Sequence, residues 1–222
     1  DFMCILISGH KINAKLSSDD NKLLPAIASK LVEFYPGLNN SISFTEDKLS
    51  DFDAVIATGS NNTSRYFEYY FGKYPNIIRK NRNGVAVLSG NETGEELIKL
   101  GEDVFQYFGM GCRSVSRLYV PKGYEFIKLL DAFNSYGQVI NNNKYKNNYD
   151  YYKSIYLINR VKHLDNGIIL IKEDVQYSSP PSVIYYEEYN DLNSLNKELA
   201  DKEESIQCIV SDPEYMKNAI PY

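Results

Sequence analysis

Cys112 lies in a segment whose composition suits nucleophilic chemistry. Gly109 and Gly111 precede it and Arg113 follows it. Because glycines lack side chains, a ligand would have room to reach the Cys112 sulfur. If Cys112 opened a helical turn, the helix dipole and Arg113 would favour the nucleophilic thiolate. The alternative interpretation is a small, inert core residue, since free cysteines are commonly buried.

A second candidate is the segment Ala57-Thr58-Gly59-Ser60, where an apolar run ends and a helix is expected to begin. Unpaired backbone N–H groups at a helix start favour an anion such as phosphate. Gly59 would let that ligand approach the backbone. Short glycine motifs are weak signals, however, and the segment also fits a plain strand-to-helix turn with Ser60 as N-cap.

A third candidate is Lys15, at the end of the first predicted strand. A lysine at the carboxyl end of a parallel strand can meet a ligand in the crevice there, although a solvated surface lysine fits as well. The two histidines, His10 and His163, show no metal-ligand spacing. A Cys/His hydrolase would need one of them beside Cys112, and the sequence leaves that alternative open.

Apolar runs that alternate with helical periodicity predict an α/β fold with a parallel sheet. Polar residues 141–149 are interpreted as a surface loop, and Cys4 and Cys208, in apolar runs, as core residues. We find no internal repeat. The expected strands are 12–16, 53–58, 84–88, 117–120, 167–171, 182–186 and 206–210, and the expected helices are 22–32, 64–70, 95–108, 124–133, 151–159 and 192–202.

Composition excludes several classes of protein. The chain has 222 residues, of which 43% are hydrophobic, so it can bury a core and is not disordered. Its 24 basic and 29 acidic residues give a net charge of −5, which argues against a dedicated nucleic-acid binder. No apolar stretch approaches the roughly 20 residues that span a membrane.

The cysteines and the chain start bear on compartment and processing. Three widely spaced cysteines favour reduced thiols and a cytoplasmic protein. The first residues lack the basic region of a signal peptide and an initiator Met. We therefore expect the chain to be part of a longer or processed protein.

Taken in order, four motifs resemble the aldehyde dehydrogenase superfamily. They are residues 9–18, Thr58-Gly59-Ser60, residues 87–91 and Gly111-Cys112. The likeness spans nearly the whole chain, and residues 52–126 are most similar to the bacterial fatty acyl-CoA reductases of the bioluminescence (LuxC-like) type. The resemblance implies the C-terminal part of a Rossmann-type cofactor domain over 1–86 and an α/β catalytic domain over 87–222.

The resemblance also implies residue roles. Lys15 matches a lysine that contacts the adenosine ribose or its 2′-phosphate, and Ser17 lies in the same turn. Ser18 stands where NAD-preferring members often carry glutamate, which favours NADPH. Gly59 and Ser60 match the turn near the cofactor pyrophosphate. Cys112 matches the nucleophile that forms an acyl-thioester.

Departures from the family pattern shape the functional prediction. Val87 matches the position of a general-base glutamate, and valine cannot activate water. Glu92 is a possible substitute, and the acids within residues 172–177 have an ambiguous register. The rest of the cofactor sheet and the oxyanion asparagine would precede residue 1, so the chain alone is expected to lack a complete site.

We therefore predict NADPH-dependent reduction of a long-chain acyl-CoA to the aldehyde, with acyl-CoA as the substrate partner. The resemblance also implies a homodimer. The alternatives are an aldehyde-oxidising or other acylating dehydrogenase, and a nucleotide-binding fragment without chemistry.

Overall fold

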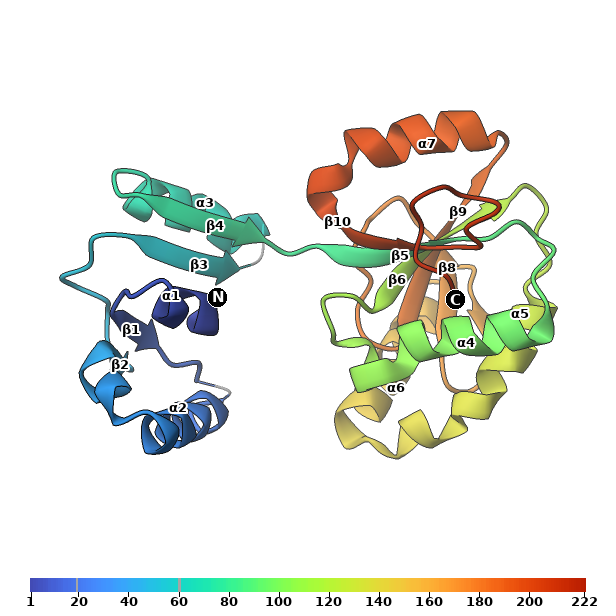
Figure 1. The fold of residues 1–222 in the computed structure, drawn as a ribbon. Helices are drawn as coiled ribbons and strands as arrows, with labels where there is room; N and C mark the ends of the chain where they lie inside the picture. The colour runs from blue at the N-terminus through green and yellow to red at the C-terminus, as the bar shows by residue number, and fades with distance from the viewer. Residues whose placement is uncertain (19, 60) are drawn as a thin grey trace. The chain divides into compact units, whose positions relative to one another are not determined.

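The structure, a computed structural model, describes residues 1–18, 20–59 and 61–222 (Figure 1). The chain divides into two compact units, Asp1–Lys80 and Asn81–Tyr222. The resemblance implies a boundary between residues 86 and 87. The division comes earlier because strand β5 (Asn83–Val87) pairs on both sides with strands of the second unit.

The N-terminal unit contains two short parallel strand pairs. Strand β1 (Ile12–Lys15) pairs with β2 (Ile42–Thr45), and β3 (Val55–Gly59) pairs with β4 (Asn76–Lys80). The predicted strands at 12–16 and 53–58 are confirmed, whereas β2 and β4 were not predicted. Strand β2 alternates apolar and polar residues over only four positions, and β4 has two apolar residues among five, so each gives a short signal. The helices are α1 (Phe2–Ile7), α2 (Leu23–Phe34), η1 (Pro36–Ser41) and α3 (Asn61–Phe71).

The C-terminal unit is built on a six-stranded sheet with the order β10-β5-β6-β9-β8-β7. All neighbouring strands are parallel except β7 and β8. The predicted parallel sheet is therefore confirmed here. The strands not yet given are β6 (Val115–Pro121), β7 (Leu164–Asp165), β8 (Leu170–Glu173), β9 (Val183–Tyr189) and β10 (Ile206–Val210).

Helices cover both faces of this sheet (Figure 1). Along β5, Ala86 packs toward α4 and α5, whereas Val85 and Val87 pack toward α7. A strand buried on both faces has a continuous apolar sequence, as residues 85–88 do. The helices are α4 (Gly94–Phe105), η2 (Gln106–Gly109), α5 (Ile127–Phe133), η3 (Asn134–Asn141), α6 (Asn143–Ile158), α7 (Leu192–Asp201) and η4 (Glu203–Ser205).

The prediction of a surface loop over residues 141–149 is wrong, because α6 already begins at Asn143. The Asn142 side chain accepts a hydrogen bond from the Tyr145 N–H at 3.0 Å and so caps the helix. Tyr145, Tyr149 and Tyr156 are buried at helical spacing. The many asparagines hide this stripe in the sequence, since asparagine favours turns.

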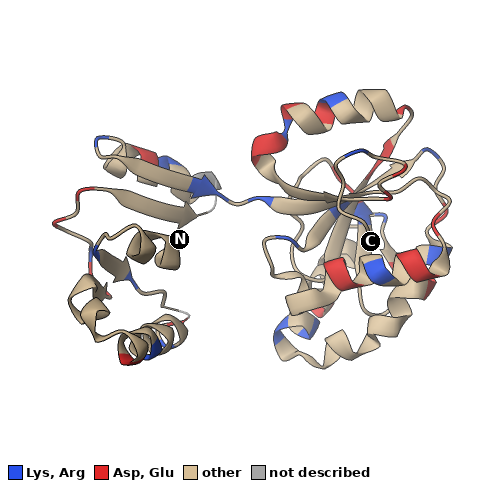
Figure 2. Cartoon of the chain, in the orientation of Figure 1, with Lys and Arg blue, Asp and Glu red and all other residues tan. Residues whose placement is uncertain are grey.

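In the part of the chain that the structure describes, every helix is too short or too polar to cross a bilayer. Charged residues of both signs are mixed along the helices, as on α4, where Lys99 lies between Glu95 and Glu102 (Figure 2).

Candidate functional site

Cys112 lies at the tip of a tight turn between η2 and β6. The Ser114 N–H donates to the Gly111 carbonyl at 3.0 Å, and the Gly111 N–H donates to the Ser114 Oγ at 3.2 Å. Cys112 and Arg113, between them, are exposed. The hypothesis that Cys112 opens a helical turn is wrong, because the chain enters strand β6 instead. The alternative interpretation of Cys112 as a small core residue is wrong as well, because Cys112 is exposed to solvent.

The chain approaches this turn through strained backbone. Tyr107, Phe108 and Gly109 have φ angles of 54°, 60° and 69°. The left-handed region costs a non-glycine residue about 1–2 kcal/mol, so packing must enforce the geometry. Phe108 packs against the core beneath α4 and α5, while Tyr107 stays exposed. Phe108 therefore anchors the segment that leads into the Cys112 turn on the core of the C-terminal unit.

Val87 is fully buried, and its side chain packs toward α7. Strand β5 pairs in parallel with β6 so that Val87 lies opposite Tyr119, whereas Cys112 precedes Val115 at the other end of β6. The structure does not bring the Val87 position to Cys112. The absence of a carboxylate at residue 87 therefore carries no information about water activation at the Cys112 sulfur.

Glu92 is occupied by the loop that follows β5. Its carboxylate accepts hydrogen bonds from the N–H and Oγ of Ser89 and from the Gly90 N–H, the last at 3.1 Å. The loop lies beyond the carboxyl end of β5, on the side opposite the Cys112 turn. Glu92 thus holds a turn together, and the suggestion that it substitutes for a general base gains no support from its place.

Gly59 ends strand β3, directly before helix α3. A Cβ at this position would lie 3.0 Å from side-chain atoms of both Thr63 and Phe67. The glycine therefore permits close packing of the helix on its strand, which is a structural reason for its presence. Ser60, the other residue expected near a pyrophosphate, lies outside the described residues.

Lys15 is the last residue of β1, which pairs in parallel with β2. Its predicted place at the carboxyl end of a parallel strand is confirmed. Lys15, Ser17 and Ser18 are exposed and close in sequence. Lys15 and Gly59 lie on different strand pairs of the N-terminal unit, and Cys112 belongs to the other unit.

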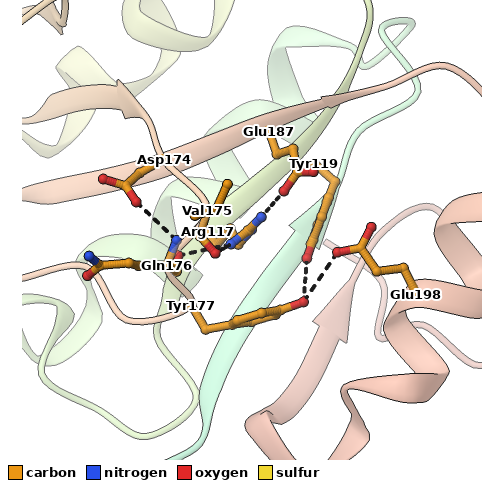
Figure 3. Close-up of polar contacts among 8 residues, drawn as sticks. All are labelled: Arg117, Tyr119, Asp174, Val175, Gln176, Tyr177, Glu187 and Glu198. Atoms are coloured by element: carbon orange, nitrogen blue, oxygen red, sulfur yellow. Dashed lines mark hydrogen bonds and ion pairs between the residues drawn. The ribbon is translucent and has the colours of Figure 1, made fainter.

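Sequence reasoning missed Arg117, a cation buried in the middle of β6. It is 1% exposed. One guanidinium nitrogen donates to the carbonyls of Val175 and Gln176, and another pairs with Glu187 (Figure 3). This arrangement fixes the segment that leaves β8. A charged residue within the apolar stretch 115–120 is the signal that could have revealed it.

Two tyrosine rings enclose the Arg117 guanidinium. The rings of Tyr119 and Tyr177 lie 4.8 and 4.7 Å from it, and their hydroxyls are 3.1 Å apart (Figure 3). Such stacking stabilises a desolvated cation. Burial, together with the hydrogen bond from Tyr119 to Tyr177, raises the pKa of the Tyr119 hydroxyl far above its usual range, so this group stays neutral.

An open hollow of about 560 Å³ borders the same segment. It is lined by Glu173, Asp174, Val175, Tyr186, Glu187 and Glu188. Burial opposes ionisation of Asp174, but the Lys172 ammonium at 2.6 Å and the Gln176 N–H outweigh it and hold the pKa of that carboxyl below its usual value. Among the acidic residues within 172–177, Asp174 is thus occupied by an ion pair and a backbone hydrogen bond. Among the described residues, no group of three or more His, Cys, Asp or Glu could hold a metal ion.

The sequence matches no protein-family model and no curated protein. Solved structures do resemble the fold. The P. syringae AldA indole-3-acetaldehyde dehydrogenase, a mutant in complex with NAD+ and IAA, superposes with a TM-score of 0.69 at 11% identity, over 96% of this chain and 52% of that one. A mutant of Bradyrhizobium japonicum proline utilization A (PutA) has a TM-score of 0.63 at 12% identity, over 93% of this chain and 25% of that one.

A third similar structure, PutA from Corynebacterium freiburgense, has a TM-score of 0.60 at 12% identity, over 93% of this chain and 28% of its own. This chain therefore spans about a quarter of the PutA proteins and about half of AldA. It has an aldehyde-dehydrogenase-like fold, as the motif series implied.

Proposed function

We propose that this chain belongs to an oxidoreductase that uses Cys112 as a nucleophile toward a carbonyl carbon and a nicotinamide nucleotide as hydride carrier. The observation that carries the proposal is the exposed Cys112, presented by a turn that two hydrogen bonds between Gly111 and Ser114 close, in an aldehyde-dehydrogenase-like fold. The similar AldA structure is that of an aldehyde dehydrogenase with NAD+ bound. We propose an equivalent cofactor here.

The residues of the N-terminal unit fit such a cofactor. Lys15 supplies a positive charge at a strand end, and Ser17 and Ser18 bring no negative charge beside it. A 2′-phosphate would be attracted to Lys15 and not repelled by a carboxylate at residue 18, so we propose NADPH. The α3 helix begins just after Gly59 and would favour the pyrophosphate at its N-terminus.

Within this scheme we propose an acyl-CoA as the substrate. The Cys112 thiolate attacks the thioester carbonyl, the bond from carbon to the CoA sulfur breaks, and the CoA thiolate leaves. The bound cofactor supplies hydride for reduction of the acyl group. Breaking the bond from carbon to the Cys112 sulfur then releases the aldehyde and restores the thiolate. The Cys112 N–H would donate to the oxyanion during attack.

The resemblance of residues 52–126 to fatty acyl-CoA reductases supports this substrate class. The second candidate is oxidation of an aldehyde to an acid. It is favoured by the AldA likeness and is no longer disfavoured by Val87, which lies away from the Cys112 turn.

Intact mass spectrometry of the natural full-length protein tests the proposal. Incubation with a long-chain acyl-CoA should add one acyl group to Cys112, and NADPH should remove it with release of aldehyde. Cys112→Ser should abolish the adduct, whereas Cys4→Ser, a change in the other unit, should leave it intact. Acylation of the Cys112→Ser protein would refute the nucleophile. Acid production from aldehyde and NADP+ without CoA would favour the second candidate.

A further inference from the structure

Cys208 of β10 lies against the turn that carries Cys112. Its Sγ donates a hydrogen bond to the carbonyl of Arg113 at 3.7 Å. In the neighbouring strand β5, Gly84 pairs with Cys208, and a Cβ on Gly84 would collide with the backbone carbonyls of Arg113 and Ser114. A glycine at this point lets the turn lie directly against the β10–β5 edge of the sheet. The sulfur of Cys208 therefore reaches the peptide next to Cys112.

The two cysteines differ in exposure and in electrostatic environment. Burial raises the pKa of the Cys208 thiol above its usual value. Arg113 lowers it, while negative charge on Asp103 and on Cys112 raises it further. Cys208 is half-buried and Cys112 is exposed. An oxidant in solution therefore reaches the Cys112 sulfur more readily than the Cys208 sulfur. The Cys208 sulfur contacts the residue that follows Cys112.

We propose that Cys112 and Cys208 form an intramolecular disulfide when hydrogen peroxide oxidises Cys112. The Cys112 sulfur attacks one peroxide oxygen and the O–O bond breaks. One molecule of water is released, and Cys112 becomes a sulfenic acid. The Cys208 sulfur attacks that sulfur, the S–O bond breaks, and a second water leaves. In total, two thiols and one peroxide give one disulfide and two waters.

Closure of the disulfide requires the exposed turn to bring Cys112 to Cys208. A disulfide needs the two Cα atoms within about 7 Å and the Cβ vectors facing each other. Cys112 lies at the tip of a turn outside the regular strands, so its movement toward β10 displaces solvent rather than core side chains. The disulfide would protect Cys112 from irreversible sulfinic acid formation. It does not depend on the proposed enzymatic function, because its formation requires only the two thiols and the oxidant.

Peptide mapping of the full chain tests the pair directly. The protein is treated with hydrogen peroxide under native conditions, remaining thiols are blocked with N-ethylmaleimide, and the digest is analysed by mass spectrometry. A linked peptide pair containing Cys112 and Cys208 should appear, and dithiothreitol should remove it. Cys4→Ser, at an exposed cysteine of the other unit, should leave the linkage unchanged.

Cys208→Ser should abolish the linkage, and Cys112 should then accumulate as sulfinic acid that dithiothreitol cannot reverse. Cys208→Ala provides a second variant without a hydroxyl, and thermal melts identify any variant that fails to fold. The wild-type map alone can overturn the proposal. The proposal is overturned if Cys112 is found as sulfinic acid while Cys208 is still modified by N-ethylmaleimide. It is also overturned if the disulfide forms only between separate molecules.

Discussion

The two compact units bury parallel strands of similar composition to very different degrees. In the N-terminal unit, the paired residues Ile56 and Ile77 are 38% and 51% exposed. In the C-terminal unit, the β5 residues Val85 and Val87 are completely buried. The difference lies in how many layers cover the sheet, since α7 and the α4–α5 pair enclose β5 on both faces. Apolar sequence alone therefore does not tell how much stability a strand contributes.

Leu118 should reveal the largest difference between the units. It is fully buried on β6, so Leu118→Ala should cost about 2–5 kcal/mol through lost burial and a cavity. Ile77→Ala, at an exposed strand position, should cost less than about 1 kcal/mol. Hydrogen exchange of peptides from each unit, measured alongside urea unfolding, checks both values. Equal losses for the two variants would contradict the comparison.

Arg117→Ala tests whether the C-terminal unit depends on its buried cation. The change leaves the carbonyls of Val175 and Gln176 without their donor and removes the partner of Glu187. Since Glu187 is partly solvated, we expect a loss of about 2–3 kcal/mol rather than the full cost of a buried charge. Urea unfolding measures it, with Arg82→Ala, at an exposed arginine, as the control. An unfolding midpoint equal to that of Arg82→Ala would disprove the structural role.

Gly59→Ala probes the packing of helix α3 on strand β3 in the N-terminal unit. The new methyl group would press on Thr63 and Phe67, so we expect a loss of about 1–2 kcal/mol, measured as faster exchange of α3 amides. Gly94→Ala is the matched control, because a Cβ there meets no atom within 4 Å. Unchanged α3 protection in Gly59→Ala would show that the helix can shift without cost.

The smallest expected effect concerns pH. Burial raises the pKa of Asp165, but Lys153 at 2.7 Å, Tyr149 and the Gly167 N–H outweigh it, so the pKa lies below its usual value. A carboxyl whose pKa is lowered in the folded state stabilises the fold at pH values above its unfolded-state pKa of about 4. This stabilisation is lost as the pH falls from that value through the lower folded-state pKa.

Asp165→Asn should therefore flatten the acid side of the stability curve of the C-terminal unit, by about 0.5–1 kcal/mol after solvent screening. Urea midpoints at several pH values between about 3 and 6 check this. Asp201→Asn, at an exposed residue, should keep the wild-type slope. A wild-type slope in Asp165→Asn would rule the carboxylate out as the source.

Much of the secondary structure was predictable because its signals are local. Residues 84–88 form a dense apolar run, and Thr93 with Glu96 forms the capping box that starts α4. The short strands β2 and β4 escaped prediction because pairing with β1 and β3 forms them. The tyrosine-rich start of α6 escaped it because burial of its tyrosines outweighs its polar composition. Cys4, assigned to a core by its apolar neighbours, is exposed.

The sequence by itself determined the alternating α/β order, the parallel sheet and the identity of Cys112 as a candidate nucleophile, since these follow from residue type and short-range periodicity. Only the tertiary structure decided the environment of each site residue. It buried Arg117 between two tyrosines, moved Val87 away from the Cys112 turn, and brought Cys208 beside that turn. Such proximities join residues tens of positions apart, and they depend on strand register and layer packing, which no local pattern encodes.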